Sequence, residues 1–291
     1  AAEGPSLSMI LTNGLRTGQT SSNGENQPGC RLYPKVEDVV NRYKKFIMKF
    51  ISDFFLTLSF LSRLARPKCC NDDDMGRTLP WFSLVGLVLG LLVALPVFLG
   101  IAKDYPLVQA WIILSAGFYI TRGLHWDGWA DLWDAWASQA KDDRFWQIIK
   151  DSRIGAFGVM GLIIGMGGQL ILLHEAARQH LWVIIVWAYI LGRLGAVILA
   201  YSGKKHSRPG LARLFLTDAD KKALSWNLFV MAGFGLLFID IKIMVFSLLL
   251  LCLGIYTLYS LGRKKQGING DFLGSAIIWG ELSGLLAITL V

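Results

Sequence analysis

Apolar residues in this chain gather in long windows that few charges interrupt. A helix needs about 20 predominantly apolar residues to cross the hydrocarbon core of a bilayer. On this criterion the sequence predicts seven membrane-spanning helices, at residues 79–102, 107–124, 156–174, 181–201, 226–239, 241–260 and 272–291. The fifth window is short, and Asp240 and Lys242 separate it from the sixth, which predicts a tight turn there. We therefore expect an all-α, polytopic helical membrane protein.

Composition and charge support this expectation and predict the orientation. Hydrophobic residues make up 54% of the chain and charged residues 17%, whereas soluble domains carry about 25% charged residues. The net charge of +8 could indicate a nucleic-acid binder, but with a crossing at every window 25 of the 29 Lys and Arg residues fall on one side. Such an excess marks the cytoplasmic side. We expect a multi-pass protein of the cytoplasmic (inner) membrane, bound to the lipid bilayer and not to nucleic acid, with its N-terminus in the cytosol and its C-terminus outside.

The chain before the first window falls into two parts. Residues 1–35 are rich in Gly, Ser, Asn and Thr without an apolar period, so we expect a disordered arm. The residues before Met9 resemble a cloning remnant. Between Val36 and Pro67 apolar residues recur at helical spacing with lysines between them, a pattern typical of helices on anionic membrane surfaces. We expect 36–67 to be interfacial or re-entrant, with an eighth span as the alternative, and 79–291 to form the transmembrane catalytic domain.

One long polar interruption with internal order lies at residues 125–158, on the side predicted to be cytoplasmic. At about 100° per residue, Asp127, Asp131 and Asp134 share one face of a helix. Four tryptophans lie nearly opposite: Trp126, Trp129, Trp133 and Trp136. Three like charges in one stripe repel, so the pattern favours a cation between them, and oxygen ligands suit Mg²⁺ held together with substrate phosphates. We expect the tryptophans to rest at the lipid headgroups or against neighbouring helices.

Further polar residues follow this segment. We predict a new helix N-cap at Asp142 or Asp143, with a helix over about residues 144–151. Asp151 could add a metal ligand, while Lys150 and Arg153 could hold phosphate oxygens.

Polar residues also stand within or beside later windows. Arg193 and Glu281 either pair with each other or line the inner wall of the site, because a charge within a span needs a partner or a polar cavity. Asn269 and Asp271, before the last window, offer two more oxygen ligands.

Three runs of this sequence together resemble the cobalamin synthases, the adenosylcobinamide-GDP ribazoletransferase family of integral membrane proteins. They are G-L-H-W-D-G-W-A-D-L-W-D at 123–134, K-D-S-R-I-G-A-F-G at 150–158 and N-G-D-F-L-G-S-A at 269–276. The likeness runs from about Phe55 to the C-terminus and leaves the chain before about Phe46 uncovered. Three positions depart from the family pattern: Ser83 replaces the usual Pro, Ala135 a frequent Gly, and Ile278 a frequent Glu that would form a carboxylate pair with Glu281.

The resemblance implies a reaction that joins adenosylcobinamide-GDP to α-ribazole, or to its 5′-phosphate, and releases GMP. The acceptor's 5′-hydroxyl would attack the phosphorus attached to cobinamide, and such a transfer needs positioning and charge neutralisation. The family's motif positions fall here on His125, Asp127, Asp131, Asp134, Asp151, Ser152, Arg153, Asp271, Arg193 and Glu281. The resemblance leaves open whether further copies of the chain or other enzymes of the corrinoid pathway join it.

Roles follow from combining these positions with the chemistry. Asp127, Asp131 and Asp134 are expected to bind Mg²⁺, or Mn²⁺ in its place, with Asp151 or Asp271 as further ligands. Arg153, assisted by Lys150, would stabilise the departing GMP, and His125 is the candidate general base. The residues expected to bind substrate are Ser152, Arg193, Asn269, Asp271 and Glu281.

Other functions require patterns that this sequence lacks. A CDP-alcohol phosphotransferase also begins its acidic helix with D-G but places further aspartates at another spacing. A UbiA-like prenyltransferase would need paired D-D-x-x-D motifs. An ion-coupled transporter, the alternative from a different class, would place acidic groups near mid-membrane in matching halves, whereas here nearly all lie on one side.

Overall fold

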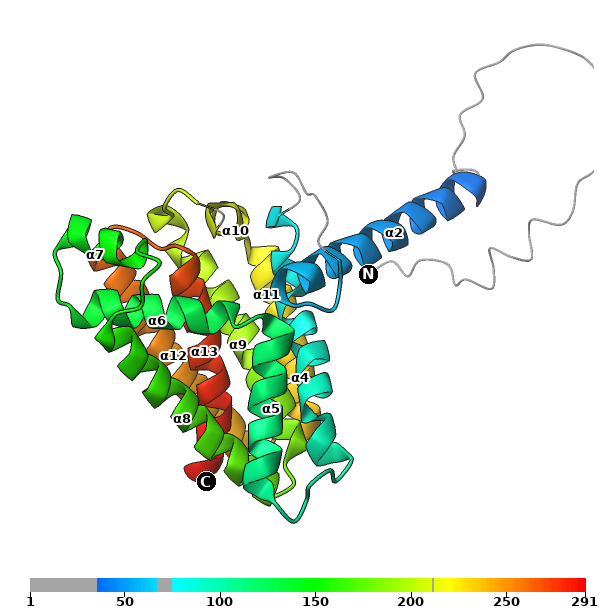
Figure 1. Cartoon of the computed structure of the whole chain (residues 1–291). Helices are drawn as coiled ribbons and strands as arrows, with labels where there is room; N and C mark the ends of the chain where they lie inside the picture. Colours follow the sequence, from blue (N-terminus) through cyan, green and yellow to red (C-terminus); the bar gives the residue numbers. More distant parts are fainter. Residues whose placement is uncertain (1–35, 67–74, 211) are drawn as a thin grey trace, which may run out of the picture. The chain divides into compact units, whose positions relative to one another are not determined.

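The computed structural model describes residues 36–66, 75–210 and 212–291, and the arm predicted for 1–35 lies outside them. The described residues are helical and form no strand, only an isolated bridge between Ser207 and Ile268. The expectation of an all-α protein is confirmed (Figure 1). The chain divides into Ala1–Lys45 and a compact unit, Phe46–Val291, which we call the membrane unit.

The helices follow one another with short connections. They are α2 (Val36–Leu61), α4 (Phe82–Phe98), α5 (Pro106–Thr121), α6 (Leu124–Ala137), α7 (Asp142–Ile149), α8 (Ala156–Arg178), α9 (Trp182–Gly203), α10 (Ala212–Asp218), α11 (Lys221–Phe238), α12 (Ile241–Lys264) and α13 (Gly270–Leu286). Short 3₁₀ turns precede α4 at Leu79–Trp81, follow α9 at Lys204–His206 and follow α13 at Ala287–Thr289.

Five helical stretches in the described residues are long and apolar enough to cross a membrane singly: 79–98, 156–178, 182–206, 241–264 and 270–289. A sixth span would need α5 and α6 together, and these two helices are bent by 92°. With 16 residues, α5 alone is about 24 Å long against a hydrocarbon core of about 30 Å. The structure therefore supports a polytopic membrane protein with five to six candidate spans, where the sequence predicted seven. The two windows that are not single candidate spans are 107–124 and 226–239, the shortest two, which correspond to α5 and α11.

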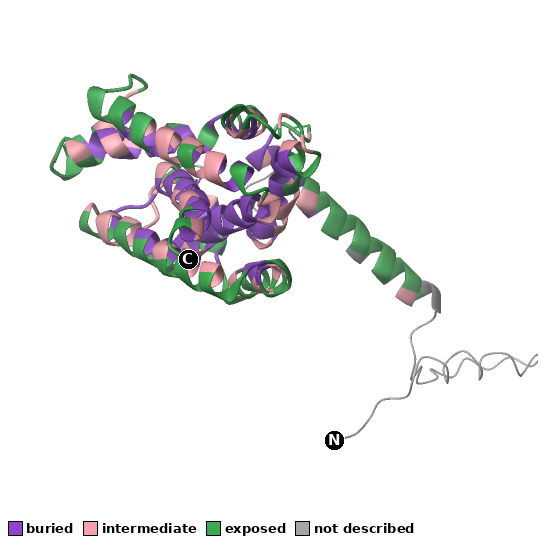
Figure 2. Cartoon of the chain, turned by 90° about the horizontal axis from the view of Figure 1, so that it is seen from below, coloured by how far each residue is buried: buried purple, intermediate pink, exposed green. Residues whose placement is uncertain are grey.

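The core of the membrane unit surrounds α9, which is buried along nearly its whole length. Buried residues gather in the middle of the bundle (Figure 2). Small residues let the helices around α9 approach it closely, as membrane helices require. A Cβ at Gly280 of α13 would lie 2.6 Å from the Leu191 carbonyl oxygen, and one at Gly86 of α4 would lie 2.6 Å from that of Tyr189. These close approaches give Gly86 and Gly280 a packing role against α9.

Two local predictions have opposite outcomes. The turn before α12 is confirmed, because the Asp240 side chain caps that helix by accepting a hydrogen bond from Lys242 N at 2.8 Å. The predicted N-cap at Asp142 or Asp143 is wrong. Lys141 is the N-cap of α7 and makes no side-chain cap bond, so both aspartates lie in the first turn, where their charge interacts favourably with the helix dipole.

Two consecutive residues in the left-handed region turn the chain between α5 and α6. Arg122 has φ 61° and Gly123 has φ 67°. Arg122 is held there because its Nη2 donates to the carbonyl oxygens of Ser59 at 2.9 Å and Phe60 at 3.1 Å, at the end of α2. As a result α6 lies across the end of the bundle at which α7 and α10 also lie, opposite the C-terminus (Figure 1). With 14 residues, α6 by itself is too short to cross a bilayer, and it lies outside the membrane-spanning helices.

Candidate active site

The site is built where α6 crosses the beginning of α13. A Cβ at Gly128 would lie 2.7 Å from the Asp271 Cα, and one at Gly274 would lie 3.4 Å from the His125 Cα. The Ser275 hydroxyl donates to the Gly128 carbonyl oxygen at 3.2 Å. This backbone approach brings the first and the third sequence motifs together. Gly128 and Gly274 both lie inside the sequence motifs, but no local pattern marks either of them as a crossing point.

The carboxylates at this crossing repel one another. Burial, followed by the charges of Asp271, Asp127 and Asp134, raises the pKa of Asp131 from 3.8 to about 7. Asp127 is exposed, while Asp131 and Asp271 are partly buried. Within the described ranges no three His, Cys, Asp or Glu side chains are close enough to hold a metal ion together. Negative charge is therefore concentrated at the crossing, but the carboxylates do not converge on one point.

Asp134 serves a different partner. It is buried, and its two carboxylate oxygens accept hydrogen bonds of 2.7 Å from the backbone N–H groups of Gly155 and Gly158. These groups belong to the N-terminus of α8, where unpaired N–H groups and the helix dipole favour an anion. Asp134 therefore ties α6 to α8, a role different from the metal binding predicted for it.

The second motif lies in the exposed loop between α7 and α8. Arg153 Nε and Nη2 donate to the two carboxylate oxygens of Asp151 at 3.0 and 2.8 Å. These hydrogen bonds hold the pKa of Asp151 at about 2. Lys150 and Ser152 are exposed beside this pair. Asp151 and Arg153 thus form an ion pair with each other, and neither contacts the carboxylates of α6.

A cavity of about 190 Å³ opens beside the crossing. Its polar edge consists of His125, Asp127 and Asp271, and its other walls are apolar. His125 is 4% exposed, and its Nε2 has no hydrogen-bond partner among the described residues. Burial, and then the positive charge of Arg193, lower the pKa of His125, so the ring is neutral near pH 7. Nε2 is itself buried, so it can accept a proton from a bound molecule only when the ring turns this nitrogen toward the cavity.

Arg193 and Glu281 lie behind His125. They form a buried ion pair, which is one of the two arrangements predicted for them, and neither lines the cavity of about 190 Å³. The Gln169 side-chain amide donates to Glu281 Oε2 at 3.0 Å, and the Arg193 guanidinium lies 4.7 Å from the centre of the Tyr189 ring. Gln169 and Tyr189 were missed because residues from α8 and α9 that meet in a bundle share no local sequence signal.

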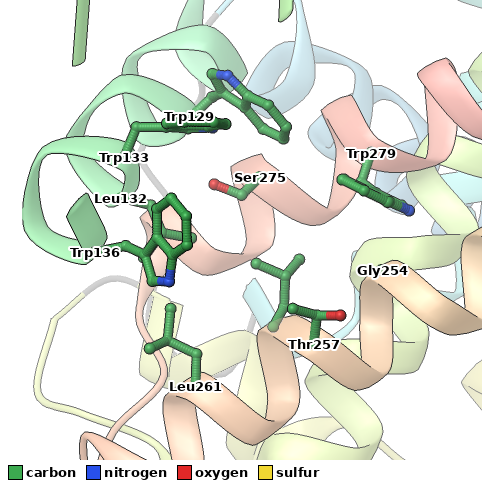
Figure 3. Close-up of a pocket in the computed structure, with 10 residues that line it drawn as sticks. Trp129, Leu132, Trp133, Trp136, Gly254, Thr257, Leu261, Ser275 and Trp279 are labelled. Atoms are coloured by element: carbon green, nitrogen blue, oxygen red, sulfur yellow. The ribbon is translucent and has the colours of Figure 1, made fainter. Parts of the chain in front are cut away.

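The opposite face of α6 lines a second cavity, of about 200 Å³, between α6, α12 and α13 (Figure 3). Trp129, Trp133, Trp136 and Trp279 line it, and no carboxylate does. Trp129 stacks on Trp279 with the ring centres 6.4 Å apart. The indole N–H groups of Trp129 and Trp279 donate to backbone carbonyl oxygens at 2.9 Å. The predicted tryptophan face of α6 is confirmed for Trp126, Trp129 and Trp133, which pack against neighbouring helices, while Trp136 is 54% exposed.

The connection before α13 completes the site. The Asn269 side-chain amide donates to Asp271 Oδ2 at 2.7 Å, while Asn269 Oδ1 is buried without a partner among the described residues. Ile268 N donates to the His206 carbonyl oxygen at 2.7 Å, and Arg208 N donates to that of Ile268 at 3.0 Å. These bonds hold the basic connection after α9 beside the start of α13.

Comparison with known proteins agrees with this arrangement of motifs. The family described as cobalamin-5-phosphate synthase matches residues 53–289. The chain belongs to this family. It is therefore a transferase of cobalamin biosynthesis, and neither the CDP-alcohol phosphotransferase nor the transporter alternative stands. The matched region contains all three motifs and begins within α2.

Curated relatives bear the name adenosylcobinamide-GDP ribazoletransferase. The protein of Nitratidesulfovibrio vulgaris strain Miyazaki F is 42% identical over 231 residues, which cover 79% of this chain and 92% of the relative. That of strain Hildenborough is 43% identical over 242 residues, or 82% and 97%. The Geotalea daltonii protein is 30% identical over 247 residues, again 82% and 97%. No solved structure matches the chain significantly.

Proposed function

We propose that this protein joins adenosylcobinamide-GDP to α-ribazole, or to its 5′-phosphate, to give adenosylcobalamin, or its 5′-phosphate, and GMP. The names of relatives that are 42–43% identical support these substrates. One structural observation carries the location of the reaction: α6 and α13 cross so that His125, Asp127 and Asp271 border one cavity. A neutral imidazole and a cluster of carboxylates at one edge suit the transfer of a phosphoryl group to a hydroxyl.

The donor groups at the crossing fit a hard divalent cation. Asp127, Asp131 and Asp271 would hold Mg²⁺, or Mn²⁺, together with oxygens of the diphosphate, once their side chains turn toward one another. The mutual repulsion of the carboxylates around Asp131 and the unpaired oxygen of Asn269 support a cation site here. When bound, the ion would neutralise the charge of the diphosphate and of the departing GMP. Asp134 is the weakest of the predicted ligands, because both its oxygens are already hydrogen-bonded.

The chain's own residues would then act as follows. His125 accepts the proton of the attacking 5′-hydroxyl once its ring turns the unpaired, buried Nε2 toward the cavity. Arg153 exchanges Asp151 for a phosphate of the departing GMP, and Lys150 and Ser152 assist it from the same exposed loop. Arg193 and Glu281 act behind His125, as a buried pair that holds it in place, rather than by touching substrate.

The orientation in the membrane forms part of the same proposal. The end of the bundle that carries α6, α7 and α10 faces the cytosol, and the C-terminus faces the other side of the inner membrane. Soluble nucleotides and GMP would then enter and leave on the cytosolic side.

Purified protein in nanodiscs tests this proposal directly. Incubated with adenosylcobinamide-GDP, α-ribazole and Mg²⁺, it should release GMP and form adenosylcobalamin, both detected by mass. Asp127→Asn and Asp271→Asn should lower the rate at least about a hundredfold, since each removes one oxyanion from the ion's binding set. Asp143→Asn, an exposed acid in the first turn of α7, is the matched control and should retain the rate. Absence of GMP release by the wild type would refute the proposed reaction.

A further inference from the structure

The cavity beside His125 has an unusual composition for a site that handles nucleotides. Its volume is about 190 Å³, and only His125, Asp127 and Asp271 supply ionisable side chains to it. The remaining walls are hydrocarbon or glycine: Phe60, Leu61, Phe82, Leu124, Ala212, Phe215, Gly270, Leu273, Gly274 and Ile277. The occupant must therefore be polar at one edge and apolar over the rest of its surface.

Three phenylalanines form the apolar wall. Phe215 of α10 lies between Phe60 of α2 and Phe82 of α4, with ring centres 4.9 and 5.9 Å apart. Phe82 and Phe215 are buried, whereas Phe60 is only partly buried. Aromatic pairs at such distances favour a further flat ring, because edge and face contacts add to the burial of apolar area.

The cavity is larger than a single small aromatic ring would fill. An apolar cavity of about 150 Å³ holds one benzene ring. At about 190 Å³, this cavity has room for a larger, bicyclic ring. The cavity of about 200 Å³ is unsuitable for a reacting group, because it lies on the tryptophan face of α6 and neither Asp127 nor Asp131 lines it.

The proposed substrates contain rings of very different polarity. Guanine carries several hydrogen-bond donors and acceptors, and each of these groups costs free energy when it is buried without a partner. The base of α-ribazole is a dimethylated benzimidazole, whose only hydrogen-bonding group is a single ring nitrogen. The apolar walls match the benzimidazole and penalise guanine.

From this match, and resting on the proposed function, we infer that the Phe60–Phe82–Phe215 cavity binds the base of the incoming α-ribazole. The base lies against the phenylalanines, while the ribose extends toward His125, Asp127 and Asp271. This arrangement would place the 5′-hydroxyl at the polar edge of the cavity, beside His125, Asp127 and Asp271. The cavity thereby selects an acceptor with an apolar base.

Steady-state kinetics with each substrate varied in turn test the inference. Phe60→Ala and Phe215→Ala should raise KM for α-ribazole about tenfold and leave KM for adenosylcobinamide-GDP within about twofold, since loss of one aromatic contact weakens only the ligand that touches it. Phe229→Ala removes an exposed phenylalanine of α11 that does not line the cavity, and should change neither value. A rise in KM for adenosylcobinamide-GDP alone, or equal rises for both, would overturn the inference.

A binding measurement separates this inference from the proposed reaction. Free 5,6-dimethylbenzimidazole should compete with radiolabelled α-ribazole in equilibrium dialysis against the wild-type protein, and adenine should not. The competition should weaken about tenfold in Phe60→Ala, the variant whose side chain is least buried and least needed for folding. Competition by adenine as strong as that by the benzimidazole would overturn the inference. Because dialysis requires no turnover, it decides the inference even if no GMP is released.

Discussion

The charged form of Asp131 destabilises the folded protein, because the side chain is partly buried among other carboxylates. Its pKa is raised from 3.8 to about 7 by burial and by Asp271, Asp127 and Asp134. Replacing this carboxylate with the neutral amide of similar shape should relieve the repulsion. We therefore expect Asp131→Asn to make the metal-free protein more stable and the enzyme inactive, since the same charge would serve to bind the cation.

The size of this stabilisation follows from the change in the pKa of Asp131. A rise from 3.8 to about 7 corresponds to about 4 kcal/mol if the carboxylate is fully shielded from water. Because Asp131 is only partly buried, solvent screening reduces this value to about 1–2 kcal/mol. In soluble domains of comparable size, about 1 kcal/mol changes the unfolding midpoint by about 2–4 °C. The midpoint of Asp131→Asn should therefore exceed that of the wild type by roughly 2–8 °C at pH 8.

The stability gained by Asp131→Asn should depend on pH in a characteristic way. Between pH 3.8 and about 7 the folded protein keeps the Asp131 proton and the unfolded chain does not, so this group's contribution to stability falls as pH rises. Above about pH 7 the contribution is constant. The advantage of Asp131→Asn should hence be small near pH 5, grow up to pH 7 and remain level at pH 8.

Thermal scans of both proteins in nanodiscs with EDTA, at one scan rate and at three pH values, measure this effect. Added Mg²⁺ should raise the midpoint of the wild type and not that of Asp131→Asn, because binding to the folded state stabilises it. A lower midpoint for Asp131→Asn at pH 8 would contradict the electrostatic reasoning. Full turnover by the variant would contradict the role in metal binding.

Three further predictions follow from other parts of the structure. Asp134→Ala should lower the free energy of unfolding by about 2–4 kcal/mol, measured by denaturant titration, because it removes two charge-assisted hydrogen bonds to α8. An unchanged midpoint would show that α8 begins without this cap. Activity should vanish with EDTA and return with Mg²⁺ or Mn²⁺, and GMP release that is insensitive to the chelator would exclude the ion. Ser138→Cys in a Cys-free protein should react with an impermeant thiol reagent from the cytosolic side and Arg178→Cys from the other, and the reverse pattern would invert the orientation.

Local patterns in the sequence were enough to predict the all-helical fold class and the arrangement of Asp and Trp residues on α6. The windows predicted the apolar helices because the bilayer alone dictates their length and composition. The alternation of Asp and Trp on α6 followed from a period of 3.6 residues, which any helix imposes. Both predictions depend on residues that are neighbours along the chain.

The tertiary structure decided how these elements meet. The turn at Arg122 and Gly123 places α6 across the bundle because carbonyl oxygens of α2, some 60 residues earlier, hold the arginine. Asp134 caps α8 rather than facing Asp127, and Asp271 takes its place beside Asp131, because α13 approaches at Gly128. The sequence by itself determined which residues carry charge and which face of each helix they occupy. Only packing between distant helices could decide which of those charges share a site, since that depends on contacts no local pattern encodes.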